Sequence, residues 1–179
     1  MPAPSLPPFF VGITPPPELT ARVLAWQAKL EHVITVPHVT LLAPAALPQK
    51  RWQSVAAAVA ERQTAAPVTL GRVDFFGSRV IFLSVDAPAL HELHRNLVSE
   101  LGQAPGDFAL ENYHPHLTLA LEWRSLNVTW KQAIESAQQE FSDLETQPLA
   151  FTASQLVLFG KDRAGQSYTE RQRFDLNLT

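Results

Sequence analysis

Two short motifs in this chain combine residue types that can transfer protons and bind oxygen anions. The pattern His-x-Thr-Leu occurs at His38 and Thr40 and again at His116 and Thr118. On a β-strand, residues i and i+2 point to the same face, so each motif presents an imidazole beside a hydroxyl. If the two copies face each other, two imidazoles and two hydroxyls surround one centre. The recurrence of so specific a pattern favours one shared site over two unrelated structural histidines.

The reaction that suits this set of groups is an in-line displacement at phosphorus. Histidine has the unperturbed side-chain pKa nearest neutrality. One imidazole can therefore take a proton from water while the other gives a proton to the leaving oxygen. The two threonine hydroxyls can donate hydrogen bonds to the oxygens of a phosphoryl group. The motifs predict metal-independent cleavage of a phosphodiester, with the histidines as catalytic residues and the threonines as phosphate-binding residues.

A metal site is the main alternative for the same region. His114 lies two positions before His116 and shares its face if the strand starts early. With His38 as a third imidazole, this pair has the ligand type of a zinc site. Neither motif contains a carboxylate, and threonine hydroxyls suit a phosphate better than a metal, so we expect no metal ion and no other cofactor. His91 and His94 lie in an expected helix, at its surface or at the boundary of the core.

The remaining sequence predicts the elements that must position both motifs. Apolar residues at spacings of three and four indicate helices, and short apolar or β-branched runs indicate strands. Gly77 and Ser78 indicate a tight two-residue hairpin. The expected helices are 18–32, 48–65, 88–103 and 130–144, and the expected strands are 8–13, 36–43, 68–76, 79–85, 116–121, 149–159 and 168–176.

The order of these elements indicates an internal duplication. From residue 36, strand, helix, strand, strand and helix are followed by strand, helix, strand and strand, and the segment 37–41 matches 115–119. A period of roughly 80 residues is too long for a solenoid, so two related lobes are expected. The repeats lie at about 36–103 and 114–177. Hairpins mixed with helices favour an α+β fold over a doubly wound parallel sheet.

The composition limits the kind of protein. The 179 residues are 46% hydrophobic and 17% charged, which suits one folded domain and excludes a disordered chain. Cysteine is absent, which excludes disulfides and thiolate sites and fits a cytoplasmic protein. The net charge of −3 argues against a grip on long nucleic acid, although a local cluster can bind a nucleic-acid terminus. No apolar run approaches the roughly 18 residues of a membrane helix. Residues 1–8 are expected to form a flexible arm and not a signal peptide.

The paired motifs in a duplicated α+β chain resemble the 2H phosphoesterase superfamily. Within it, the chain is similar to the RNA 2′,3′-cyclic phosphodiesterases, also called 2′-5′ RNA ligases, over nearly all of its length after residue 8. The segments that carry this resemblance are Phe9–Ile13, Ser78–Leu83 and Tyr113–Leu119. The resemblance implies a single bilobal domain over residues 1–179, in which two mainly antiparallel sheets face each other across a central cleft, with helices outside. It also implies hydrolysis of a terminal 2′,3′-cyclic phosphate to a 2′-phosphate without a metal.

The same resemblance assigns roles to the histidines and leaves the clamping cation open. It implies that His38 is the general acid to the leaving 3′-oxygen and His116 the base for water, although pseudo-symmetry makes this direction hard to assign from sequence. Many relatives carry a basic residue five positions after the second histidine, where this chain has Leu121. The expected phosphate- or RNA-clamping cation is therefore Arg124, the nearest basic residue, or Arg79, for which a solvated hairpin end is the alternative.

Aromatic residues near the motifs are candidates for stacking on a nucleobase. Phe10 and Tyr113 are the substrate-binding candidates, with core packing as the alternative for one of the two neighbouring phenylalanines, Phe9 and Phe10. The polar segment 161–166 is expected to be a hairpin loop, with contact to substrate as the alternative.

The sequence thus predicts a monomeric, cytoplasmic enzyme whose substrates are RNA ends or small cyclic nucleotides, with no membrane and no obligate protein partner. Alternatives within enzymes are a phosphodiesterase acting on another small cyclic phosphate, such as that of ADP-ribose, and 2′-5′ RNA ligation by the same groups in reverse. A non-catalytic RNA-end or nucleotide-binding module is the alternative of another class. Both motifs are intact, which counts against that last alternative.

Overall fold

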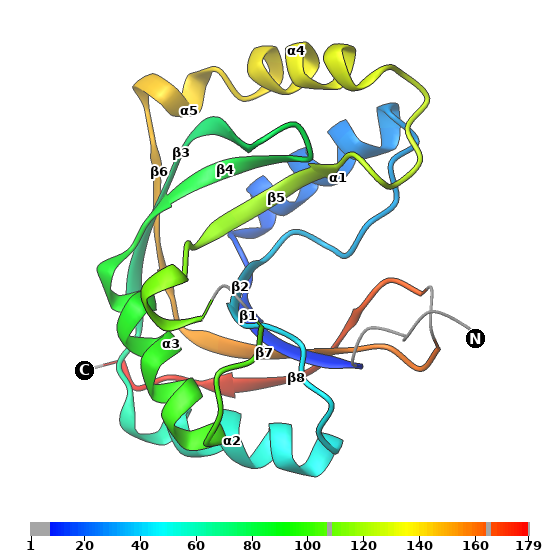
Figure 1. Cartoon of the computed structure of the whole chain (residues 1–179). Coiled ribbons are helices and arrows are strands. Elements are labelled where there is room, and N and C mark those ends of the chain that lie inside the picture. Colours follow the sequence, from blue (N-terminus) through cyan, green and yellow to red (C-terminus); the bar gives the residue numbers. More distant parts are fainter. Residues whose placement is uncertain (1–7, 107–108, 164–165, 179) are drawn as a thin grey trace.

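The computed structural model describes residues 8–106, 109–163 and 166–178, so most of the expected N-terminal arm lies outside the described residues. The strands are β1 (Phe9–Ile13), β2 (Val39–Leu42), β3 (Ala66–Phe76), β4 (Val80–Asp86), β5 (His116–Leu121), β6 (Leu149–Ala153), β7 (Gln155–Gly160) and β8 (Thr169–Asp175). The helices are α1 (Pro17–Lys29), α2 (Gln49–Arg62), α3 (Pro88–Leu101), α4 (Trp130–Glu140) and α5 (Asp143–Thr146), with a 3-10 turn η1 (Leu110–Asn112). This is the expected α+β composition (Figure 1).

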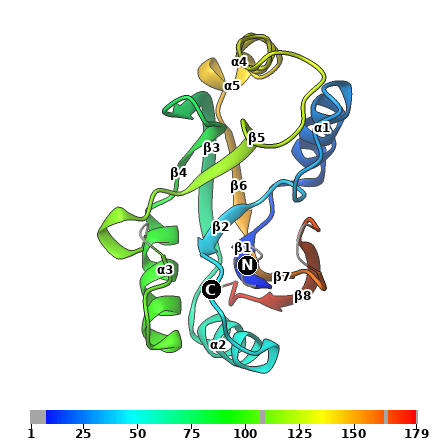
Figure 2. The ribbon, with the colours of Figure 1, turned by 45° about the vertical axis from the view of Figure 1, so that its right-hand side comes forward.

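The strands form one continuous sheet, where two separate sheets were expected. Its order is β6-β3-β4-β5-β2-β1-β7-β8, and the neighbouring strands are antiparallel. The two groups of four strands are joined because β2 pairs with β5 at the centre. Figure 2 shows that the sheet is strongly curled, in the manner of a half-barrel. We call β8, β7, β1 and β2 the first half-sheet, and β5, β4, β3 and β6 the second half-sheet.

The helices divide between the two half-sheets. In the first, α2 packs on α3 and against β1, β7 and β8, while α3 packs against β2. In the second, α1 contacts β5 and is held to α4 by a hydrogen bond of 2.9 Å from Trp26 Nε1 to Ser136 Oγ. Figure 1 shows α2 and α3 at the lower end of the molecule and α4 at the upper end. None of the described helices is both long and apolar enough to cross a bilayer.

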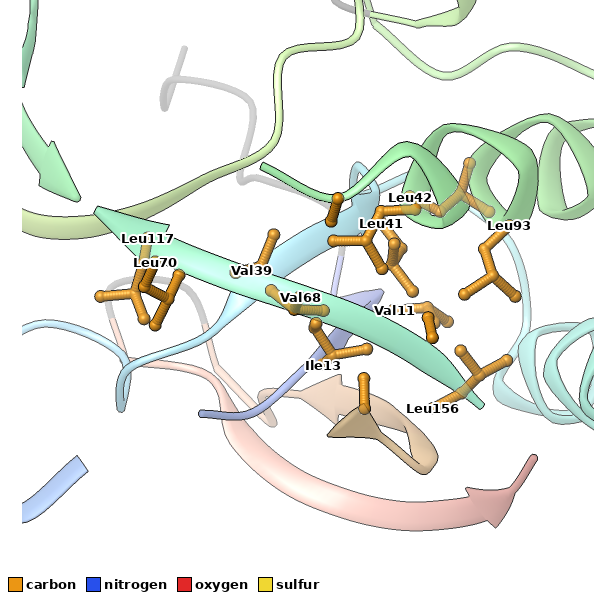
Figure 3. Packing of buried hydrophobic residues seen from close by; sticks show 14 of the residues in the cluster. Val11, Ile13, Val39, Leu41, Leu42, Val68, Leu70, Leu93, Leu117 and Leu156 are labelled. Carbon is orange, nitrogen blue, oxygen red and sulfur yellow. The ribbon is translucent and has the colours of Figure 1, made fainter. Parts of the chain in front are cut away.

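The two central strands alternate between a buried apolar face and a partly exposed polar face. Val39, Leu41, Leu117 and Leu119 are completely buried in the core, whereas the histidine and threonine of each motif are partly exposed. Figure 3 shows three of these buried side chains, Val39, Leu41 and Leu117, packed with residues from neighbouring strands and from α3. Burial of the apolar set therefore fixes which face carries the polar set, since a shift of one residue would exchange the two.

Three elements differ from the sequence-based boundaries. The expected strand 149–159 is two strands that break at Ser154, because β6 pairs with β3 in the second half-sheet while β7 pairs with β1 in the first. The expected helix 130–144 ends at Glu140 and is followed by the short α5. The hairpin between β3 and β4 has three residues and not two, since Phe76 pairs with Val80.

Candidate active site

The two motifs meet where β2 and β5 pair. The register partners are Val39 and Leu117, the middle residues of the two motifs. Continuing this antiparallel register by one residue in each direction places each histidine next to the threonine of the other motif. Because Val39 and Leu117 are buried on one face, the four polar side chains share the opposite face. The structure therefore brings together all four residues that the sequence singled out.

Both imidazoles are oriented by the same local hydrogen bond. His38 Nδ1 donates to the carbonyl of Val36 at 2.8 Å, and His116 Nδ1 donates to the carbonyl of His114 at 2.8 Å. A carbonyl can only accept, so this bond fixes the proton on Nδ1 and leaves the lone pair of a neutral ring on Nε2. Within the described part of the chain, neither Nε2 makes a hydrogen bond. Both nitrogens are available to a bound molecule.

An aromatic pair from the first half-sheet supports the ring of His38. The His38 ring centroid lies 5.0 Å from that of Phe10 and 5.2 Å from that of Phe159. The two phenylalanine rings stack on each other at 4.9 Å. They come from neighbouring strands, in which Phe10 of β1 pairs with Phe159 of β7. These rings limit the movement of the imidazole and shield it from water.

The second half-sheet repeats this arrangement under His116. The His116 ring centroid lies 4.8 Å from that of Phe76 and 5.3 Å from that of Phe82, and the two phenylalanine rings stack at 4.2 Å. They come from β3 and β4, which are neighbours as β7 and β1 are. The pseudo-symmetry that the repeated motif indicated thus extends to the residues that support each imidazole.

Burial favours the neutral form of both imidazoles in the free protein. The pKa of His38 is lowered to about 4, chiefly by loss of hydration; the hydrogen bond to the Val36 carbonyl acts in the opposite direction, and the charge of His116 adds a smaller decrease. Burial also lowers the pKa of His116, with a further decrease from His114 and an opposing effect of its backbone hydrogen bond. The effect of His116 on the pKa of His38 is consistent with close rings. A bound anion would favour the charged form and raise both pKa values.

The two candidate cations lie at the edge of this arrangement. Arg79 is exposed, with its guanidinium 3.8 Å from the Glu122 carboxylate and 4.8 Å above the centroid of the Trp123 ring. Arg124 makes a hydrogen bond of 3.4 Å to Ser167 Oγ. Among the described residues, neither guanidinium is hydrogen-bonded to a motif histidine or threonine.

Phe10, the first of the two aromatic candidates, packs against the ring of His38. Phe10 is only 3% exposed, and its ring is surrounded by those of His38, Phe159 and Tyr168. It therefore has no free face for a nucleobase.

Tyr113 connects the approach to the second motif with the first motif. Its hydroxyl donates to the carbonyl of Thr40 at 2.7 Å, and its ring stacks on His94 at 4.1 Å. Desolvation raises the pKa of Tyr113, so the hydroxyl keeps its proton and remains a donor. Tyr113 is placed to hold Thr40 in position.

His94 is a supporting residue that the sequence-based prediction missed, since it lies in the core and not at the surface or the core boundary, as expected. It is 3% exposed, with Nδ1 donating to the carbonyl of Leu41 at 2.6 Å and Nε2 accepting from the amide of Leu110 at 2.8 Å. The available signal was its spacing on α3, because Leu90 and Leu97 lie four residues before it and three after it on the buried helix face.

The third histidine near the site is exposed. The ring of His114 lies 5.0 Å from that of Phe76 and 6.3 Å from that of His116. Among the described residues, no group of three or more His, Cys, Asp or Glu side chains is arranged to hold a metal ion. The expected loop 161–166 lies between β7 and β8, and its residues 164 and 165 are outside the described residues.

Comparison with known proteins gives a consistent picture. A family model described as the 2′-5′ RNA ligase superfamily matches residues 15–165. Among solved structures, TT0787 of Thermus thermophilus has a TM-score of 0.66 at 18% identity, covering 94% of this chain and 97% of that one. E. coli LigT in its apo form has a TM-score of 0.64 at 21% identity, covering 97% and 99%. E. coli LigT complexed with 3′-AMP has a TM-score of 0.62 at 20% identity, covering 96% and 98%. These likenesses establish the fold, and no curated protein matches the sequence.

Proposed function

Because this chain belongs to the 2′-5′ RNA ligase superfamily, we propose that it hydrolyses the terminal 2′,3′-cyclic phosphate of RNA to a 2′-phosphate. The observation that carries this proposal is the pair of imidazoles, each with Nδ1 bound to a carbonyl and Nε2 left for a substrate. A threonine of the other motif lies beside each ring. Two proton-transfer groups and two hydroxyl donors around one space match the needs of a phosphodiester displacement.

The proposed step needs one proton on the histidine pair. His116 Nε2 takes a proton from water as the water oxygen forms a bond to phosphorus. The bond from phosphorus to the 3′-oxygen breaks, and His38 Nε2 gives its proton to that oxygen. The products are a 2′-phosphate and a free 3′-hydroxyl, and a proton moves from His116 to His38 through solvent before the next turnover. The negative charge of the substrate favours the protonated imidazole that burial otherwise opposes.

The two threonine hydroxyls stabilise the charge that develops on phosphorus-bound oxygens. Thr40 and Thr118 stand beside the imidazoles and can each donate one hydrogen bond to a non-bridging oxygen. Such donors act without reorganisation when they are held before the reaction. For Thr40, the hydrogen bond from Tyr113 to its carbonyl supplies that hold.

Two related activities use the same groups. The same displacement, with a ribose 5′-hydroxyl in place of water as the nucleophile, gives 2′-5′ ligation: the 5′-oxygen bonds to phosphorus, the bond to the 3′-oxygen breaks, and the 3′-oxygen takes the proton. Hydrolysis of another small cyclic phosphate needs the same histidines and a different neighbouring surface. E. coli LigT has been solved with ATP, NADP+ and 3′-AMP, which supports our proposal that nucleotides are the ligands of this site. We propose that the protein acts as a monomer, since each residue of the step comes from one chain.

Removal of either imidazole tests this function. We expect His38→Ala and His116→Ala each to lower kcat on an oligoribonucleotide with a 2′,3′-cyclic phosphate by about 10³-fold, because each removes one proton-transfer group. Identification of the product by phosphorus NMR should show a 2′-phosphate. Lys131→Ala is the control, since Lys131 lies on α4 beside Glu135, and its kcat should be unchanged.

The same assay separates the alternatives. A 3′-phosphate product, or full activity of either motif variant with normal folding, would contradict the proposal. We expect turnover to survive an excess of EDTA, whereas loss with EDTA and recovery with zinc would favour a metal-dependent reaction.

A further inference from the structure

One largely covered cation next to the site, Lys161, has no anionic partner in the part of the chain that the structure describes. Lys161 follows β7 and is only 9% exposed. Among the described residues, its ammonium group makes no hydrogen bond or ion pair, and it lies against the ring of Tyr168, whose centroid is 4.7 Å from Nζ. The side chain is thus largely covered, and an aromatic face compensates only part of the charge that its ammonium group carries. The position is suited to an anion supplied by a ligand.

A continuous row of rings connects this ammonium group with the catalytic histidine of the first half-sheet. The ring centroid of Phe10 lies 5.0 Å from that of His38 and 4.8 Å from that of Tyr168, which meets it in a T-shaped arrangement. Lys161 lies two residues after Phe159, whose ring also contacts His38. Along an extended chain this spacing puts both side chains on one face of the sheet. Lys161 therefore stands beside the site, farther along the same face.

The corresponding edge of the second half-sheet is different. There, Arg79 also lies over an aromatic ring, that of Trp123, but its guanidinium is exposed and has the carboxylate of Glu122 at 3.8 Å. Its charge is already compensated and hydrated. Of these two cation–aromatic pairs, the one at Lys161 is the more covered, and within residues 8–106, 109–163 and 166–178 it has no carboxylate beside it.

We propose that Lys161 binds the internucleotide phosphate next to the terminal cyclic phosphate, so that the RNA strand leaves the site along the half-sheet of His38. This inference rests on the proposed function and names the part of the substrate that the histidines do not contact. A single buried cation suits the end of a strand, because a grip on many phosphates needs many basic residues and the chain carries a net charge of −3. Tyr168 lines the path between the two phosphates.

A comparison of two substrates tests this assignment. A nucleoside 2′,3′-cyclic monophosphate lacks the internucleotide phosphate, and a dinucleotide that ends in a 2′,3′-cyclic phosphate has it. We expect Lys161→Gln to lower kcat/KM for the dinucleotide by about tenfold, through KM, because a charge-assisted contact is lost. The same variant should leave kcat/KM for the mononucleotide unchanged, and Lys161→Arg should retain most of the activity on the dinucleotide.

Two control variants and one binding measurement distinguish failure of the Lys161 assignment from failure of the proposed function. Lys131→Gln removes a fully separate cation on α4 and should change neither substrate. An equal loss on both substrates in Lys161→Gln, or a loss specific to the dinucleotide in Arg79→Gln instead, would overturn the assignment. If the wild-type protein hydrolyses neither substrate, the proposed function fails. The role of Lys161 in phosphate binding is then tested by the binding of a fluorescent oligoribonucleotide with a 2′-phosphate. Lys161→Gln should then weaken binding and lower the slope of log affinity against log salt by about 0.7, and equal affinity would overturn it.

Discussion

Two backbone carbonyls fix which nitrogen of each catalytic histidine is available for proton transfer. By accepting from Nδ1, the carbonyls of Val36 and His114 fix the tautomer and direct Nε2 away from the backbone. The stacked phenylalanines under each ring then restrict its rotation and remove water. This surrounding lowers the pKa of both imidazoles. The free site therefore holds fewer protons at neutral pH than two ordinary histidines would.

This lowering has a direct consequence for the pH dependence of turnover. The productive form carries one proton on the pair, and its fraction falls tenfold per pH unit above the higher of the two pKa values. We expect kcat/KM on a cyclic-phosphate oligonucleotide to fall in this way above about pH 6.5, the ordinary histidine value. In the bound complex the substrate anion raises the pKa values, so kcat should fall only at higher pH. Steady-state kinetics across this range measure both, and a flat kcat/KM to about pH 8.5 would contradict the assigned proton states.

The motif strands β2 and β5 depend on few direct contacts with each other. They pair in antiparallel register at one pair of residues, Val39 and Leu117. Tyr113 adds a hydrogen bond across the same junction, to the carbonyl of Thr40, and His94 ties α3 to β2 and to the turn before β5. These side chains, and not a long ladder, hold the two motifs in register.

Removal of the Tyr113 hydroxyl should therefore affect turnover as well as stability. Tyr113→Phe is expected to lower the free energy of unfolding by about 1 kcal/mol, the usual net value of a hydrogen bond. It should also lower kcat by about tenfold, because Thr40 is displaced from the reacting phosphate. Urea unfolding and steady-state kinetics measure the two effects.

A matched variant distinguishes positioning from simple loss of stability. Ser136→Ala removes the acceptor of the Trp26 indole between α1 and α4, far from the motifs. It should cost a similar free energy of unfolding and leave kcat unchanged. If Tyr113→Phe lost stability with an unchanged kcat, the tyrosine would be a structural residue only.

The arrangement of the whole chain brings the two half-sheets together. β3 follows α2, which covers the first half-sheet, but pairs with β4 in the second. β7 follows β6 of the second half-sheet but pairs with β1 in the first. Each imidazole therefore packs against one ring from a strand that follows an element of the other half: Phe159 of β7 contacts His38, and Phe76 of β3 contacts His116. The chain passes repeatedly between the halves, so both sides of the site are fixed by one connected sheet.

From the sequence, the four polar residues of the site could be predicted, whereas the union of the strands into one sheet could not. The repeated histidine and threonine spacing identifies the four polar residues because strand geometry alone sets which face they share. The union of the half-sheets depends on pairing between Val39 and Leu117, which are distant in sequence, and no local pattern encodes that pairing. Lys161 was missed as a single residue for a related reason. Its contact with Tyr168 joins residues on the two sides of a loop, and the sequence shows only a polar segment there.

NMR titration of the histidine side chains shows whether both imidazoles bind one and the same phosphate. Adenosine 2′-monophosphate would be added to the wild-type protein while the Nε2 resonances of His38 and His116 are followed. We predict that both resonances shift with a single dissociation constant and that the pKa of each imidazole rises in the complex, because each nitrogen faces the same anion. A response of only one histidine, or two unequal dissociation constants, would show that the two rings do not bind the same phosphate and would contradict the proposed acid–base pair.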